Sequence, residues 1–150
     1  MQNRLHSYVL SSDRSLYIHQ RLNSFITERE PFLRVDYSIT HLAQDLDIPS
    51  YQLSAYINRT MGLNFNEYIN RFRVQYCEGL IQKGLADEYN LKGLALKCGF
   101  YNRNTFTSAF KKFTGFTPSR YQRIRKLEMS SKPTFRLAFA QNYETVQERR

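Results

Sequence analysis

An internal repeat of apolar positions is the feature that most constrains how this 150-residue chain can fold. One set of positions recurs 52 residues later, and the set that follows it recurs 53 residues later. The matching pairs are Leu42 and Leu94, Ala43 and Ala95, Leu46 and Cys98, Ile48 and Phe100, Leu53 and Phe106, Ile57 and Phe110, Gly62 and Gly115, Leu63 and Phe116, and Tyr68 and Tyr121. The change of offset indicates one extra residue in the turn of the second copy. The chain therefore contains two copies of one supersecondary unit.

Each copy predicts a short helix, a tight turn, a second helix, a glycine stop and the start of a third helix. That order is the sequence form of a helix-turn-helix. Between the copies, the apolar spacing of residues 66–83 predicts a long helix, with Gly84 as the residue after its end. No segment alternates over a sustained length as a strand would. The predicted fold class is all-α, with two helix-turn-helix subdomains joined by a long central helix.

The domain organisation follows from the same pattern. The N-terminal part has a helix predicted at about 14–29, which ends before Pro31. After Glu128 the stripe of Phe135, Phe139, Tyr143 and Val146 favours a helix, while "TFRLAFA" also alternates like a strand. A disordered, docked or partner-binding tail stays open. The predicted divisions are 1–35 as a linker or fragment of a preceding domain, 36–65 as the first helix-turn-helix, 66–84 as the connecting helix, 90–128 as the second helix-turn-helix with a closing helix, and 129–150 as the tail.

The positive charge lies in one segment. The whole chain carries a net charge of +9, and residues 89–127 contain nine Lys or Arg and no Asp or Glu. The remaining parts are close to balanced. Solvated surfaces usually mix both signs, so a block of one sign is the expected footprint of a polyanion, with nucleic acid as the first candidate.

Several other classes of protein do not fit the sequence. No apolar run approaches the roughly 18 residues of a membrane span, and the N-terminus lacks the pattern of a secretory signal, which favours the cytoplasm. Cys77 and Cys98 fall in apolar-periodic segments and are expected to be buried thiols in a reducing compartment. His6, His19 and His41 have no metal-ligand spacing relative to them. We expect no metal, no cofactor and no catalytic residues, because no nucleophile-base set or glycine-rich phosphate loop is present.

The second helix of each copy divides into an apolar and a polar face. On helix 102–113, all outward side chains are cationic or hydrogen-bonding, which suits base edges and phosphates. They are Arg103, Asn104, Thr107, Ser108, Lys111 and Lys112. The outer face of helix 50–60 carries one charge and consists of Tyr51, Gln52, Ser54, Ala55, Asn58 and Arg59. We therefore expect fewer strong contacts from the first copy, in which Gln52 and Asn58 are candidates for bonds to bases or phosphates.

The chain from about Asp36 to Lys126 resembles the DNA-binding domain of AraC/XylS-type bacterial transcription regulators. The segment "GLALKCGFYNRNTFTSAFKKFTGFTPSRYQR" is close to that family's Gly-Phe turn, Phe-x-x-x-Phe-Lys-Lys helix and Thr-Gly-hydrophobic-Thr-Pro-x-x-Tyr-Arg ending. The first copy matches more loosely. The resemblance implies a sequence-specific binder of double-stranded DNA that regulates transcription, with the two recognition helices in successive major-groove segments.

The resemblance also implies roles for individual residues. Base readout is expected from Tyr51, Ser54, Ala55, Arg103, Asn104, Thr107 and Ser108. Phosphate contacts are expected from Asn58, Arg59, Lys111, Lys112 and Arg120. Ala55 stands where many relatives have a longer polar residue, and Asn58-Arg59 stands where a Lys-Lys pair is common. Both departures weaken the contacts expected from the first motif.

The resemblance further implies partners. Besides double-stranded DNA, we expect RNA polymerase or a second copy of the chain, and a sensor domain outside this sequence. The chain would then be a fragment of a longer regulator, including the cytoplasmic part of a membrane-anchored one, or a minimal stand-alone form. The alternative function is a non-specific architectural or RNA-binding module that uses the same charge without reading bases.

Overall fold

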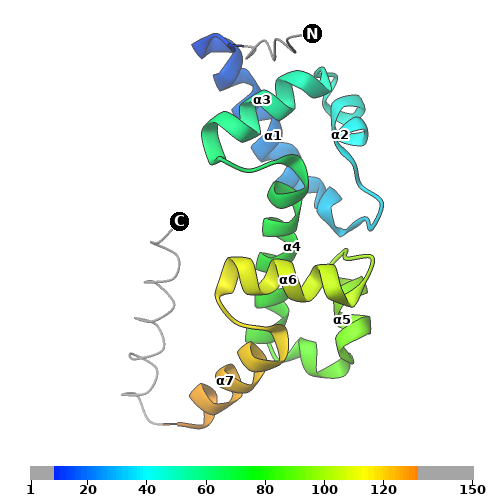
Figure 1. Ribbon diagram of the computed structural model, residues 1–150, viewed down its shortest axis with the longest axis vertical. Helices are drawn as coiled ribbons and strands as arrows, with labels where there is room; N and C mark the ends of the chain where they lie inside the picture. The colour runs from blue at the N-terminus through cyan, green and yellow to red at the C-terminus, as the bar shows by residue number, and fades with distance from the viewer. Residues whose placement is uncertain (1–8, 132–150) are drawn as a thin grey trace, which may run out of the picture. The chain divides into compact units, whose positions relative to one another are not determined.

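The computed structural model describes residues 9–131, and every regular element in that range is a helix (Figure 1). The all-α prediction is confirmed for this part of the chain, and the expectations for the tail lie outside it. The helices are α1 (Ser12–Arg29), α2 (Ile39–Leu46), α3 (Ser50–Met61), α4 (Phe65–Gln82), α5 (Leu91–Lys97), α6 (Arg103–Thr114) and α7 (Pro118–Ser130), with short 3-10 turns η1 (Pro31–Leu33) and η2 (Leu85–Glu88).

The described helices form two compact units, each containing one copy of the repeat. The division falls within α4, between Ile69 and Asn70. The first unit holds α1, α2, α3 and the start of α4, and the second holds the rest of α4 with α5, α6 and α7. Because each unit has its own core, each helix-turn-helix is supported by residues close to it in the sequence.

In the first unit, α1 packs against both helices of the helix-turn-helix. Its buried face consists of Ile18, Leu22 and Ile26, spaced by four residues so that they share one side of the helix. Apolar residues of α2 and α3, among them Leu42 and Leu53, complete this core. Helix α1 is therefore a structural part of the first unit, and it fixes one side of α3.

The core of the second unit is richer in aromatic side chains. Phe100, Phe106 and Phe110 are fully buried, and Tyr121 of α7 is 2% exposed. The ring of Phe110 meets those of Phe106 and Tyr121 edge to face, with centroids 5.7 and 5.3 Å apart. Such pairs contribute about 0.5–1.5 kcal/mol beyond simple burial. This aromatic cluster holds α6 and α7 together.

The backbone repeats its geometry in the two turns. Asp47 and Gly99, at the same place in the two copies, both have positive φ, of 53° and 84°. Directly after them, the N–H of Ile48 donates to the Ala43 carbonyl at 3.1 Å and the N–H of Phe100 donates to the Ala95 carbonyl at 2.9 Å. Both copies therefore end their first helix with the same hydrogen bond and bury an apolar residue at the same position, Ile48 in the first copy and Phe100 in the second.

The structure confirms the helix starts that were predicted from capping residues. The Ser38 hydroxyl accepts from the backbone N–H of His41, the Asn90 side chain accepts from that of Gly93, and the Thr117 hydroxyl accepts from that of Arg120. Each oxygen satisfies a backbone N–H that lacks a partner inside its helix. These caps fix where α2, α5 and α7 begin.

The residues that helix α4 buries differ from the apolar stripe that its sequence predicts, which consists of Tyr68, Ile69, Phe72, Tyr76, Cys77, Leu80 and Ile81. Tyr76 and Leu80 are only half-buried, whereas Arg73 and Val74 are buried. The physical reason is that α4 is shared by the two units, so residues near its start and residues further along need not lie on one stripe. Val74 belongs to the core of the second unit.

Candidate nucleic-acid interface

Helix α6 presents its polar side chains outward because its apolar side is fixed in the core. Phe106, Ala109, Phe110 and Phe113 are buried, which determines the rotation of the helix about its axis. The side chains predicted for the opposite side are accessible. Thr107 is half-buried, and the remaining five are exposed, namely Arg103, Asn104, Ser108, Lys111 and Lys112. The structure brings these six together along one side of one helix.

Both ends of α6 are anchored by local hydrogen bonds. At its start, the Asn102 side-chain oxygen accepts from the backbone N–H of Thr105 at 2.8 Å. At its end, Gly115 has a φ of 80°, a conformation that favours glycine. The Thr114 hydroxyl donates to the Phe110 carbonyl at 2.8 Å and accepts from the N–H of Phe116 at 3.1 Å. These contacts hold the outer face of α6 in place.

Arg120, a predicted phosphate contact, lies on the first turn of α7 and is exposed. Its guanidinium carbon is 5.2 Å from the centroid of the Phe116 ring. A cation over an aromatic face is attracted to the ring, which restricts the side chain without neutralising its charge. Arg120 therefore remains available to an anion next to α6.

Helix α3 offers a smaller set of polar groups. Tyr51 is 53% exposed, and Ser54, Asn58 and Arg59 are exposed. Ala55 is half-buried, so it offers little more than its methyl group to a ligand. Arg59 is the one cation on this face of α3, compared with Arg103, Lys111 and Lys112 on α6.

Gln52 is the main correction on α3. The sequence pattern places it on the outer face, but its side chain is only 9% exposed. Its Oε1 atom accepts from Nε of Arg14 at 2.8 Å, and its Nε2 atom donates to the hydroxyl of Tyr51 at 3.3 Å. The apolar pattern of α3 could not predict this burial, because the donor that holds Gln52 inward, Arg14, lies on α1.

The basic segment 89–127 is also less uniform than its sequence suggests. Arg125 forms an ion pair with Glu128 at 2.6 Å, and Lys126 forms one with Asp87 at 3.0 Å. Both acids lie just outside the acid-free segment. These two ion pairs therefore neutralise part of the positive charge near the end of α7.

A hollow at the start of α6 adds three residues that were not predicted as part of the interface, namely Lys92, Tyr101 and Asn102. It has a volume of about 320 Å³ and is lined by Lys92, Tyr101, Asn102, Arg103 and Asn104. Tyr101 is 80% exposed, in the turn before α6. Its signal in the sequence is an aromatic residue in a polar turn beside a basic helix. The hollow extends the polar face of α6 toward α5.

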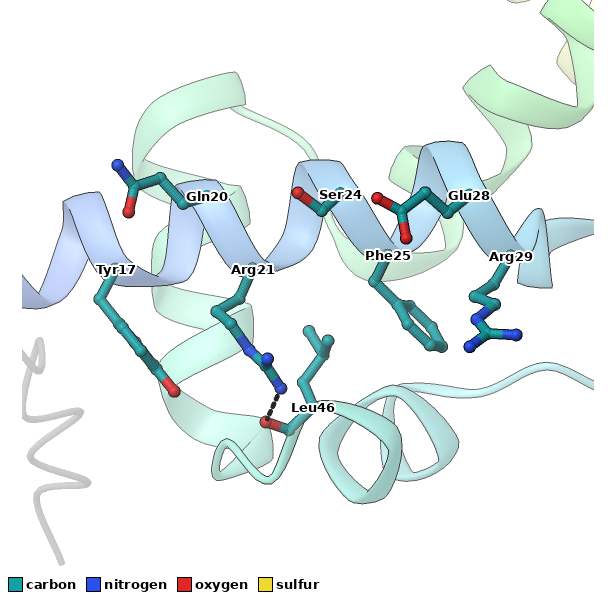
Figure 2. A pocket seen from close by; sticks show the side chains of 8 residues that line it. All are labelled: Tyr17, Gln20, Arg21, Ser24, Phe25, Glu28, Arg29 and Leu46. Carbon is teal, nitrogen blue, oxygen red and sulfur yellow. Dashed lines mark hydrogen bonds between the residues drawn. The ribbon is translucent and has the colours of Figure 1, made fainter.

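A groove on α1 lies outside the predicted interface. Figure 2 shows it, with a volume of about 380 Å³, between one face of α1 and Leu46 of α2. Within it, the Arg21 guanidinium donates to the Leu46 carbonyl at 3.4 Å. None of the predicted DNA-binding residues lines this groove.

Buried titratable groups in the second unit serve its core. The free thiols Cys77 and Cys98 are both fully buried, as expected. A hydrogen bond with Cys98 and burial raise the pKa of the Cys77 thiol far above its usual range. Burial raises the pKa of Tyr121 to about 12, and burial lowers the pKa of Arg73, which lies over the ring of Phe100. Each of these four side chains is buried within the second unit.

Two further features of the described residues bear on function. Residues 9–131 contain no cluster of three or more potential metal ligands. No helix in the same range combines the length and apolar character that crossing a bilayer requires.

Comparisons with known proteins agree with this architecture. A family model described as a helix-turn-helix domain matches residues 42–124. The transcriptional regulator YijO of Escherichia coli is 31% identical over 130 residues, which is 87% of this chain and 44% of that protein. The transcriptional activator RhaR of Salmonella arizonae is 27% identical over 112 residues, covering 65% of this chain and 38% of that protein. The chain thus spans less than half the length of these curated relatives.

Solved structures resemble the same part. A Listeria innocua protein has a TM-score of 0.60 and 34% identity, covering 71% of this chain and 96% of that one. The C-terminal domain of AraT, a response regulator from Geobacillus stearothermophilus, has a TM-score of 0.58 and 25% identity, covering 71% of this chain and 84% of that one. The similarity thus extends over most of this chain and most of each compared structure.

Proposed function

The chain belongs to the AraC-type family of helix-turn-helix transcriptional regulators, and from that membership we propose that it binds particular sequences of double-stranded DNA. The observation that carries this proposal is the outer face of α6. It combines one arginine, two lysines and three uncharged hydrogen-bonding side chains, without a carboxylate. Such a face supplies both base contacts and phosphate contacts.

The two ends of α6 are proposed to have different roles. Arg103, Asn104, Thr107 and Ser108 read base edges in the major groove, where arginine pairs with guanine and asparagine pairs with adenine. Lys111 and Lys112 hold phosphates, as does Arg120 at the start of α7. Recognition helices of this kind approach the bases with their N-terminal residues, which agrees with this division.

Helix α3 is proposed to enter a neighbouring segment of the major groove. Tyr51, Ser54 and Ala55 face the bases, while Asn58 and Arg59 face phosphates. Because α3 has one cation on this face and the half-buried Ala55 has only a methyl group to offer, its contacts are weaker. We propose that α6 supplies most of the affinity.

The proposal extends to the whole regulator. Since the compared regulators are more than twice as long as their aligned part, a sensor domain elsewhere in the protein would control this DNA-binding part. Its further partners would be RNA polymerase or a second copy of the chain. A cytoplasmic location would give it access to DNA.

Selection from a pool of random DNA duplexes, at physiological ionic strength, tests this function. We expect one family of sequences to be enriched and to bind about a thousandfold or more tightly than unrelated duplexes. Affinity should fall with salt in proportion to the number of phosphates contacted. Equal binding to all duplexes, or a preference for single strands or duplex RNA, would instead support a non-specific nucleic-acid-binding module.

A further inference from the structure

The turn between α5 and α6 contains one residue that has no counterpart in the first copy of the repeat. The buried residues Ile48 and Phe100 match at an offset of 52. The N-cap residues of the helices that follow, Pro49 and Asn102, match at an offset of 53. The extra residue of the second copy is therefore Tyr101, which stands between Phe100 and Asn102.

Tyr101 has a fixed backbone and an exposed side chain. The preceding residue, Phe100, is fully buried, and its backbone N–H donates to the Ala95 carbonyl at 2.9 Å. The following residue, Asn102, caps α6 by accepting from the backbone N–H of Thr105 at 2.8 Å. The side chain of Tyr101 is 80% exposed, the largest fraction among the large hydrophobic side chains in the described part of the chain. The turn therefore holds an aromatic ring with a polar hydroxyl, a combination enriched at interfaces, outside the core of the second unit.

Lys92 of α5 lines the same hollow as Tyr101. It lies on the first turn of α5 and is exposed. That turn is fixed by the cap residue Asn90, whose side-chain oxygen accepts from the backbone N–H of Gly93 at 2.8 Å. By the repeat, Lys92 corresponds to Thr40 on α2. The second motif thus has a cation where the first has a threonine, and a tyrosine where the first has no residue.

The hollow between α5 and the start of α6, which we call the α5–α6 hollow, complements an anion. Its other lining residues are Asn102, Arg103 and Asn104, so the lining contains two cations and no carboxylate. Each lining side chain carries a hydrogen-bond donor. The volume of about 320 Å³ is about ten times that of one water molecule in the liquid, so a phosphate group fits. A backbone phosphate of DNA carries one negative charge and accepts hydrogen bonds, which matches this lining.

The position of the hollow also matches the DNA backbone. Arg103 and Asn104 line it and belong to the face of α6 that we propose reads base edges. In a helix-turn-helix, the second helix places its N-terminal residues at the bases, while the first helix crosses the backbone. A hollow shared by α5 and the start of α6 therefore lies where a base contact and a backbone contact adjoin.

We propose that the α5–α6 hollow binds one phosphate of the DNA backbone, through an ion pair with Lys92 and a hydrogen bond from the Tyr101 hydroxyl. This inference rests on the proposed DNA-binding function. The phosphate lies next to the bases that Arg103 contacts and fixes the N-terminal end of α6 in the groove. Because Thr40 is uncharged and Tyr101 has no counterpart, the first motif lacks this contact, which adds to the difference in affinity between the two motifs.

Substitution of single phosphates tests this contact in the complete chain, on a duplex selected by that chain. In each duplex one phosphate is replaced by a neutral methylphosphonate, and the affinity is compared with that for the unmodified duplex. One position next to the base pair whose preference Arg103→Ala relaxes should lose about three- to tenfold in affinity, as expected for one lost contact. That position identifies the phosphate that the hollow holds.

Two variants then identify the side chains that hold this phosphate. Lys92→Ala should make the slope of log affinity against log salt shallower by about 1, and the methylphosphonate at the identified position should cause no further loss in this variant. Tyr101→Phe removes only the hydroxyl, so it should reduce the response to the same methylphosphonate and leave the salt slope unchanged. Neither variant should change the preference among bases, because a phosphate contact carries no sequence information.

Lys97→Ala is the matched control, because Lys97 lies on the same helix, is also exposed and does not line the hollow. It should keep the full response to every methylphosphonate, and thermal unfolding should confirm that all variants are folded. A full response at every position in Lys92→Ala, or an equal loss of response in Lys97→Ala, would overturn the inference alone. Equal binding of the natural chain to all duplexes would overturn the proposed function and the inference with it.

Discussion

Replacing Phe110 with alanine should destabilise the second unit selectively. Phe110 is fully buried and meets the rings of Phe106 and Tyr121 edge to face. Truncating a buried phenylalanine to alanine costs about 3–5 kcal/mol, which includes lost burial and the cavity that remains. The two lost ring contacts place this site toward the upper end of that range. Because small domains are stable by only about 5–15 kcal/mol, a large part of the stability would be removed.

Hydrogen exchange measured helix by helix is the suitable assay, because it reports stability separately for each unit. In Phe110→Ala, amides of α5, α6 and α7 should lose protection, while those of α1, α2 and α3 should keep theirs. The matched variant is Ile57→Ala, since Ile57 occupies the same position in the first copy and is also fully buried. It should reverse the pattern, at a cost of about 2–5 kcal/mol.

Equal loss of protection in both units for either variant would show that the two cores are not stabilised separately. That result would mean that the chain unfolds as one cooperative body rather than as two cores. A destabilisation below about 1 kcal/mol for Phe110→Ala would equally contradict the prediction, since the site would then not be the packed core that its burial indicates.

Three further predictions concern the interface and its support. Arg103→Ala should weaken binding by about 1–3 kcal/mol and relax the preference at one base pair. Lys112→Ala should weaken binding to all duplexes alike and make the slope of log affinity against log salt shallower by about 1. A shallower salt slope for Arg103→Ala with a relaxed base preference for Lys112→Ala would contradict these roles. Asn102→Ala removes the cap of α6 and should lower the free energy of unfolding, measured by thermal unfolding, by about 1 kcal/mol. The exposed control Asn104→Ala should lower it by less than about 0.5 kcal/mol. Equal losses for the two variants would argue against the cap. Burial raises the pKa of Tyr121 to about 12, from about 10 in the unfolded chain. The stability due to its neutral form is therefore complete below about pH 10 and is lost as the pH rises toward 12. Tyr121→Phe should flatten this alkaline decrease in unfolding curves, and an unchanged decrease would show that another group causes it.

Much of this fold can be predicted because its signals are local. A serine, threonine or asparagine at a helix start binds a backbone N–H one turn ahead, so Ser38, Asn90 and Thr117 are recognisable without tertiary information. Glycine after a helix adopts a conformation that other residues avoid, which makes Gly62 and Gly115 equally clear stops. The repeat then shows that two similar cores exist.

The features that the sequence did not predict depend on contacts between distant residues. Gln52 is polar and lies next to outward-facing Tyr51, and only Arg14, 38 residues earlier, explains why it is buried. Lys126 lies in an acid-free segment, yet Asp87, 39 residues earlier, forms an ion pair with it. Arg73 is buried with its guanidinium over the ring of Phe100. In each case a charged or polar group finds its partner only in three dimensions.

In the proposed function, two unequal motifs read one DNA site. The most direct measurement is the affinity of the chain for every single base-pair substitution of its selected duplex. We expect sensitive base pairs to fall into two blocks with centres about 10 base pairs apart, one helical turn of DNA. Substitutions in the block that loses its preference in Arg103→Ala should cost more than those in the other block. A single continuous block, two blocks of equal cost, or no sensitive base pair would show that the chain does not read DNA through two unequal motifs.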